Sequence, residues 1–176
     1  MSIERKGIME FRGKQVTIIG EDIKVGDQVP DFKVMTKDWE WVNALESQHG
    51  KVRIIGSLPS LSTGVCDRET RRFNQSAASL GDGVSIMMVS MDLPFTLNQW
   101  CAGAGIDQVL TLSDHFYAEF GKKYGVLLKE LRIFRRAVFV IDANGKAVYT
   151  EYMPTIGDEP DYEAVIEAAS NALELE

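Results

Sequence analysis

Two cysteines, Cys66 and Cys101, are the first candidates for chemistry in this chain, and they lie 35 positions apart (101 minus 66). A cysteine thiolate is a nucleophile, a metal ligand and a redox centre. The spacing excludes a CxxC redox motif and a CxxC half of a zinc site. Two cysteines in a reducing compartment are, by base rate, unrelated buried thiols that act as small hydrophobic side chains. The residues around each cysteine indicate whether it is such a buried thiol or a reactive one.

Cys66 follows a predicted buried strand at residues 52–57 and an irregular segment at 58–65, and it opens a predicted helix at 66–80. The first turn of a helix has backbone N–H groups without partners, and the helix dipole favours an anion there. We therefore expect Cys66 to be mostly thiolate at neutral pH. A thiolate can displace one oxygen of a peroxide from the other and so become a sulfenic acid.

That reaction also needs hydrogen-bond donors aimed at the O–O bond and a cover that keeps water from the sulfur. Thr63 lies three residues before Cys66 and could offer its hydroxyl, but its side chain could equally be a plain helix N-cap. Pro59 could shield the thiolate, although composition alone favours a rigid turn at the end of the strand. Spacing alone leaves both residues open.

The remaining elements follow from hydrophobic periodicity and from turn residues. In chain order, the sequence predicts a β-hairpin at 10–19, short strands at 32–35 and 39–42, the strand and helix at 52–57 and 66–80, a strand at 84–91, a helix at 95–104, a strand at 110–112, a helix at 114–123, strands at 136–141 and 146–152 joined by a turn at 142–145, and an amphipathic helix after Pro160.

Strand, helix and strand in that order indicate a parallel βαβ unit with a right-handed crossover. A later hairpin and a final helix complete the pattern of an α/β thioredoxin-like fold, a mixed central β-sheet flanked by helices, here with an N-terminal β-hairpin. The length of 176 residues fits one domain, 1–176, with its own core.

Composition limits the function. Hydrophobic residues make up 45% of the chain and charged residues 26%, which is typical of a folded globular protein. The net charge of -7 argues against nucleic acid as a partner. No stretch approaches the roughly 20 apolar residues of a membrane span, and residues 1–13 lack the apolar run of a signal peptide. We expect a cytoplasmic protein that does not bind membranes.

A metal or cofactor is not expected. The two histidines, His49 and His115, are far apart in sequence and lack the spacing of metal ligands. The chemistry is therefore expected to rest on the side chains of the protein.

The run from Pro59 to Cys66, PSLSTGVC, resembles the active-site signature of the bacterial thiol peroxidases, which are atypical 2-Cys peroxiredoxins. The likeness covers about residues 13–173 and is carried by further segments at 70–74, 92–95, 105–107, 112–114, 129–131 and 136–140. One position departs from the family pattern, because Ser62 stands where the motif usually has Asp. We expect altered local hydrogen bonding there, with the chemistry intact.

The resemblance implies roles residue by residue. Cys66 aligns with the peroxidatic cysteine, and Thr63 and Pro59 align with the Thr and Pro of the PxxxTxxC motif. Cys101 aligns with the resolving cysteine, which attacks the sulfenic acid of Cys66 within the same chain. The two sulfur atoms must meet for that step, so the helices that carry them must unwind locally.

Arg136 aligns with an arginine that opens a late core strand in the family. From the residues alone it is one of a basic cluster with Arg132 and Arg135, and such clusters are more often solvated edges. The resemblance raises Arg136 above its neighbours, because a guanidinium beside Cys66 would favour the thiolate and bind peroxide oxygens.

The implied substrates are hydrogen peroxide and organic hydroperoxides, the implied reductant is thioredoxin, and the implied assembly is a homodimer. Two other classes remain as alternatives. A thiol-disulfide oxidoreductase on the same fold would carry CxxC at the helix start, where this chain has Cys66-Asp67-Arg68-Glu69. A catalytically inactive binding module would consume no peroxide.

Overall fold

The N-terminal β-hairpin belongs to a small sheet at one end of the molecule. The computed structural model describes residues 2–175 and begins with β1 (Glu4–Phe11) and β2 (Lys14–Ile19), so the predicted hairpin is confirmed and starts earlier. Two strands that the sequence did not predict, β8 (Leu127–Leu128) and β9 (Ile133–Phe134), extend it in the order β1-β2-β8-β9. Strands of two residues show no periodicity, which is why they were missed.

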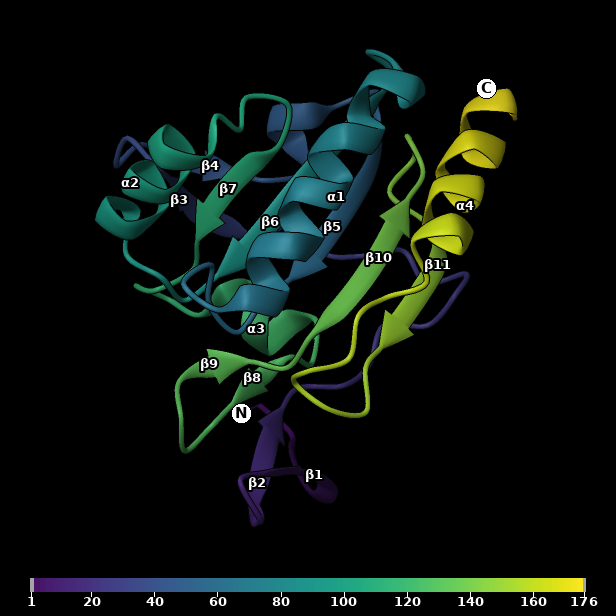
Figure 1. Cartoon of the computed structure of the whole chain (residues 1–176). Helices are drawn as coiled ribbons and strands as arrows, with labels where there is room; N and C mark the ends of the chain where they lie inside the picture. The colour runs from purple at the N-terminus through teal and green to yellow at the C-terminus, as the bar shows by residue number, and fades with distance from the viewer. Residues whose placement is uncertain (1, 176) are drawn as a thin grey trace.

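A seven-stranded mixed sheet forms the centre of the molecule, as predicted (Figure 1). Its order is β11-β10-β5-β6-β7-β3-β4, with parallel pairing at β5/β6 and β6/β7 and antiparallel pairing at the other neighbours. The strands are β3 (Lys33–Thr36), β4 (Trp41–Asn43), β5 (Val52–Ser57), β6 (Val84–Ser90), β7 (Leu110–Ser113), β10 (Ala137–Ile141) and β11 (Ala147–Tyr152).

Helices cover the two faces of this sheet unequally. The helices α1 (Gly64–Leu80), α2 (Pro94–Ala104) and α4 (Tyr162–Glu174) contribute to one core, and the short α3 (Glu119–Lys123) contributes to the other. In Figure 1, α1 crosses in front of β5 and β6 while α4 runs beside β10 and β11. Because side chains alternate along a strand, Ile54 of β5 enters the first core and Ile55 the second.

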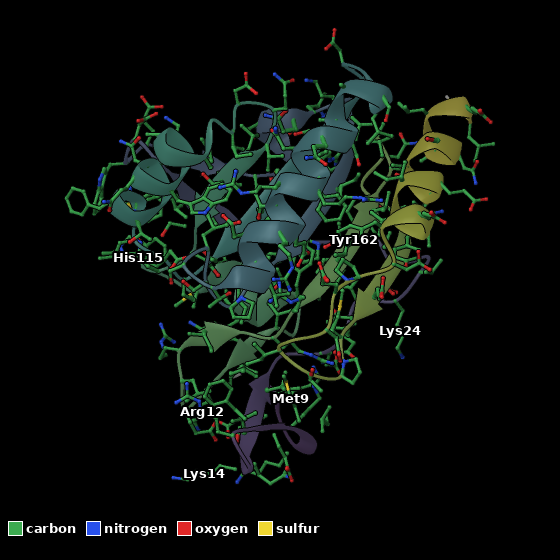
Figure 2. The ribbon with its side chains drawn as sticks, in the orientation of Figure 1. Met9, Arg12, Lys14, Lys24, His115 and Tyr162 are labelled. Atoms are coloured by element: carbon green, nitrogen blue, oxygen red, sulfur yellow. The ribbon has the colours of Figure 1, made fainter. Side chains whose placement is uncertain are left out.

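The two long helices of the first core touch each other directly. The ring of Tyr162, labelled in Figure 2 at the start of α4, packs edge-on against Phe73 of α1 with centroids 5.4 Å apart. Both α1 and α4 also contact the sheet. This packing holds the middle of α1 against the start of α4.

The prediction of a helix at 114–123 is wrong in its first half, because α3 begins only at Glu119. The carboxylate of Asp114 accepts hydrogen bonds from the backbone N–H groups of Glu119 and Gly121, and Ala118 adopts a left-handed backbone with φ of 51°. A short 3₁₀ turn, η1 (Glu46–Gln48), completes the elements. Within residues 2–175 no helix is long and apolar enough to cross a membrane.

Candidate active site

Cys66 occupies the first turn of α1. The helix begins at Gly64, two residues earlier than predicted, and Thr63 has the extended backbone of an N-cap residue. Cys66 is therefore the third helical residue, with a free thiol that is 0% exposed. The strand that leads to it, β5, is central in the sheet and buried along its length. A central strand thus delivers the thiol to a buried helix N-terminus.

Arg136 faces this thiol. It directly precedes β10, and the pairing of Ala137 with Ser57 brings it to the end of β5 where α1 starts. Its Nη2 atom donates a hydrogen bond to Cys66 Sγ at 3.2 Å, and Nε and Nη2 also donate to the carbonyl of Ile156 at 3.1 and 3.0 Å. The arginine is 0% exposed, so its contact with Cys66 is made without competing water.

Glu69 is the residue of this cluster that sequence reasoning missed. Its Oε2 atom accepts a hydrogen bond from Arg136 Nη1 at 2.6 Å, and both side chains are 0% exposed. Its other oxygen, Oε1, is one of the buried side-chain atoms without a hydrogen-bond partner within residues 2–175. One signal was available, because Glu69 lies three residues after Cys66, on the same face of a helix.

Burial sets the charge balance of this cluster. It raises the pKa of Glu69 to about 7, outweighing the attraction of Arg136. Burial also works against the charge of Arg136, but the neighbouring Glu69 and Cys66 outweigh it and raise the pKa of the guanidinium. Arg136 is therefore the constant cation of the cluster, beside a carboxyl whose charge changes near neutral pH.

The structure places Thr63 and Pro59 at the two ends of the loop before α1. Thr63 is exposed, and its hydroxyl donates to the carbonyl of Ser60 at 3.0 Å. It makes no side-chain cap bond, so the interpretation of its hydroxyl as a plain N-cap is wrong. Pro59 is buried, two residues beyond the end of β5.

Asp92 anchors that loop. Its carboxylate accepts hydrogen bonds from Ser60 Oγ at 2.7 Å, from the N–H of Leu61 at 2.8 Å and from Ser90 Oγ at 2.8 Å. Ser62 is exposed, and its Oγ lies 2.7 Å from Ser60 Oγ. Ser62, at the position where the motif usually has Asp, therefore lies at the edge of a hydrogen-bond network that ties the loop to the end of β6. Asp92 positions the loop through this network, a role that the sequence did not predict.

Cys101 lies on α2 and is 6% exposed, also as a free thiol. Its Sγ atom is 3.3 Å from Thr111 Oγ1 of β7. The two thiols thus rest against different partners, Cys66 against Arg136 and Cys101 against Thr111. The structure is that of the dithiol form.

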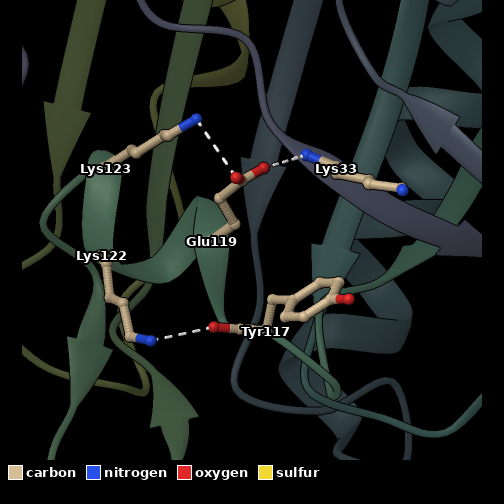
Figure 3. Close-up of a pocket in the computed structure, with 5 residues that line it drawn as sticks. All are labelled: Lys33, Tyr117, Glu119, Lys122 and Lys123. Carbon is tan, nitrogen blue, oxygen red and sulfur yellow. Dashed lines mark hydrogen bonds and ion pairs between the residues drawn. The ribbon is translucent and has the colours of Figure 1, made fainter.

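A separate pocket of about 560 Å³ lies on another part of the surface (Figure 3). It is lined by Lys33, Tyr117, Glu119, Lys122 and Lys123. Figure 3 shows that two of its lysines have local partners: Lys123 pairs with Glu119 at 3.4 Å, and Lys122 donates to the carbonyl of Tyr117 at 3.0 Å. None of its lining residues belongs to the Cys66 cluster, so we do not take it as the active site.

Comparison with known proteins gives one consistent answer. The model of the family described as Redoxin matches residues 24–166. The chain is 51% identical to the thiol peroxidase of Halalkalibacterium halodurans over 93% of this chain and 97% of that protein, and 52% identical to the thiol peroxidase of Bacillus subtilis over 90% and 94%.

Solved structures agree with the sequence relatives. A peroxiredoxin-like protein from Aquifex aeolicus superposes with a TM-score of 0.84 at 37% identity, covering 96% of this chain and 99% of that one. A thiol peroxidase from Chromobacterium violaceum gives a TM-score of 0.81 over 96% and 98%, and at 23% identity it supports the fold alone.

Proposed function

The chain belongs to the thiol peroxidases of the Redoxin family, and we propose that it reduces hydroperoxides with the thiolate of Cys66 and regenerates that thiolate through an intramolecular disulfide with Cys101. The substrates are hydrogen peroxide and organic hydroperoxides. The observation that carries the assignment of Cys66 is the buried hydrogen bond from Arg136 Nη2 to its sulfur at 3.2 Å.

In the first step the Cys66 thiolate attacks one peroxide oxygen, and an S–O bond forms as the O–O bond breaks. The sulfur loses two electrons to the peroxide and becomes a sulfenic acid, while the other oxygen leaves as alkoxide or hydroxide and takes a proton. Arg136 stabilises the thiolate before attack and the negative charge that develops on oxygen during it.

Thr63 and Pro59 complete the proposed site. The Thr63 hydroxyl donates to Ser60, so its oxygen keeps lone pairs that can accept a hydrogen bond from the peroxide O–H. Pro59 is buried where β5 gives way to the loop, and it helps to keep water from the sulfur. Asp92 holds the loop between them.

In the second step the thiolate of Cys101 attacks the Cys66 sulfur, an S–S bond forms as the S–O bond breaks, and the sulfenic oxygen leaves as hydroxide, which takes a proton from solvent to become water. Thioredoxin then reduces the disulfide, and two electrons from its dithiol restore both thiols. Cys66 and Cys101 are buried against different partners, so local unwinding of α1 and α2 must precede their meeting.

We also propose one domain, 1–176, that acts as a homodimer in the reducing cytoplasm. An aromatic cluster of exposed Trp39, Trp41, Phe95, Phe116 and Tyr117 supports the dimer. His115, which contacts Trp39 and Phe116, marks the place of this cluster beside α2 in Figure 2. Exposed aromatic groups of this size are typical of protein interfaces.

The test is a thiol count with an intact mass, on reduced protein before and after one equivalent of peroxide. We expect both thiols to disappear with the loss of two hydrogens and without a cross-link between chains. Survival of both thiols with unconsumed peroxide would overturn the assignment and favour an inactive binding module.

A further inference from the structure

Asp67, the residue after Cys66, is hydrogen-bonded to Trp100, the residue before Cys101. Trp100, which precedes Cys101 on α2, donates from Nε1 to Asp67 Oδ1 at 2.8 Å, and Asp67 follows Cys66 on α1. Arg71 donates to the second oxygen of the same carboxylate at 2.9 Å. These bonds from Arg71 and Trp100 lower the pKa of Asp67, so it is ionised at neutral pH.

Asp67 begins a polar seam along one face of α1, formed by Asp67, Arg71 and Asn74. Their spacing of four and then three residues places them on one face of the helix. Arg71 lies 5.7 Å from the Trp100 ring centroid and reaches the carbonyl of Ala104 at 3.5 Å. Asn74 accepts a hydrogen bond at 3.0 Å from the N–H of residue 108, in the segment after α2. The polar seam on α1 therefore runs along α2 from Trp100 to Ala104 and on to residue 108.

We propose that the Asp67–Trp100 hydrogen bond is a positioning contact that holds the two cysteine-bearing helices in the dithiol arrangement, and that its opening limits the rate at which Cys101 resolves the Cys66 sulfenic acid. The inference rests on the proposed roles of Cys66 and Cys101. It adds a part of the molecule that contacts neither the peroxide nor either sulfur.

The connectivity supplies the reason. Unwinding the first turn of α1 moves Cys66, and Asp67 must move with it because the two are covalent neighbours. That movement separates the carboxylate from Trp100, which is the covalent neighbour of Cys101. The Asp67–Trp100 hydrogen bond must therefore break whether α1 or α2 unwinds first. Once it is broken, it no longer holds the other helix, and the cysteine on that helix can move too. Attack of Cys66 on peroxide occurs in the folded arrangement and does not require this opening.

Trp100→Phe removes the N–H donor and keeps an aromatic ring. Asp67→Ala removes the acceptor, and Asp82→Ala, at an exposed position in the turn after α1, is its matched control. Reduced protein is mixed rapidly with hydrogen peroxide, quenched with acid, alkylated and weighed, so that sulfenic acid, disulfide and sulfinic acid are counted separately. The first step depends on peroxide concentration and the second does not.

We expect Trp100→Phe and Asp67→Ala to accelerate disulfide formation about 2- to 10-fold, the range for one partly exposed hydrogen bond, with the peroxide step within about twofold of wild type. Overoxidation to sulfinic acid should fall by the same factor, because that reaction competes with resolution. The double variant should be no faster than the faster single variant if both act through one bond.

Unchanged or slower disulfide formation in folded Trp100→Phe and Asp67→Ala would overturn the inference. A wild-type protein that forms no Cys66 sulfenic acid or no Cys66–Cys101 disulfide would instead overturn the proposed function. Circular dichroism confirms folding of each variant, and either single variant alone suffices if the other does not fold.

Discussion

Arg136 bonds Cys66 and Glu69 at the same time, with Nη2 lying 3.2 Å from the sulfur and Nη1 lying 2.6 Å from a carboxylate oxygen. All three side chains are 0% exposed, so water does little to screen them. One cation thus serves two groups that are each negative when deprotonated. Ionisation of either group weakens the stabilisation that Arg136 gives to the other, and peroxide reactivity should depend on both.

Cys66→Ser should reduce peroxide turnover by roughly 1,000-fold or more, because a serine hydroxyl in the same place stays protonated and is a poor nucleophile towards oxygen. Peroxide consumption coupled to thioredoxin measures the effect. Appreciable remaining turnover would show that another residue carries the first step.

Cys101→Ser should still reduce one equivalent of peroxide per chain and then stop with thioredoxin, since the sulfenic acid has no partner within the chain. A serine hydroxyl can keep the hydrogen bond with Thr111, so the fold should be little affected. Single-turnover stoichiometry followed by steady-state assay gives the answer. Sustained thioredoxin-coupled turnover would remove Cys101 from the resolving role.

Arg136→Ala should lower the fraction of Cys66 present as thiolate at neutral pH and slow the peroxide step by about 100-fold or more. It should also lower the free energy of unfolding by about 3 to 5 kcal/mol, because Glu69 is left buried without its cation. Thiolate absorbance and chemical denaturation measure the two effects. Arg72→Ala, on the exposed surface of α1, is the control, and an equal loss of activity there would contradict the electrostatic argument.

Glu69→Gln should act in the opposite direction on the thiol. Glu69 is ionised and competes for Arg136 mainly above its pKa of about 7, and a neutral amide does not, so a larger fraction of Cys66 should be alkylated in a given time at pH 8, by about twofold or more, with little change at pH 6. The pH profile of alkylation by iodoacetamide measures this fraction. A profile that shifts to higher pH would mean that Glu69 mainly orients Arg136 and does not compete with the sulfur.

The same variant should change how stability depends on pH. The folded pKa of Glu69, about 7, lies above its ordinary value of 4.5, so between these values the folded state binds more protons than the unfolded state. The free energy of unfolding should therefore fall as pH rises from 4.5 to 7, and Glu69→Gln should make that slope shallower.

Part of the slope should remain in the variant, because burial also raises the pKa of Asp114 to about 7. Urea unfolding at several pH values tests the difference, with the exposed Glu167→Gln as control. Identical slopes in wild type and Glu69→Gln would contradict the assignment of a raised pKa to this carboxyl.

The sequence predicted the fold class and the position of Cys66 because both depend on local patterns. The run at 52–57 is apolar apart from Arg53 and Ser57, and the helix after it has an apolar face, so the sequence predicted the strand and the helix in succession. The two-residue strands β8 and β9 and the shortened α3 escaped prediction. Their conformations depend on long-range pairing and on the hydrogen bonds of Asp114, which have no local period.

The candidate site likewise contains residues that the sequence identified and residues whose contacts only the structure revealed. The sequence determined that a cysteine stands at a helix start behind a Pro and a Thr, and likeness to a family pointed to Arg136 and Cys101. Only the tertiary structure decided that Arg136, of three nearby arginines, contacts the sulfur, that Glu69 shares it, and that Asp67 joins the two cysteine helices. Helix starts are fixed by neighbours along the chain, whereas the partner of a buried charge is fixed by which strands pair, and β10 meets β5 across more than 70 residues of sequence.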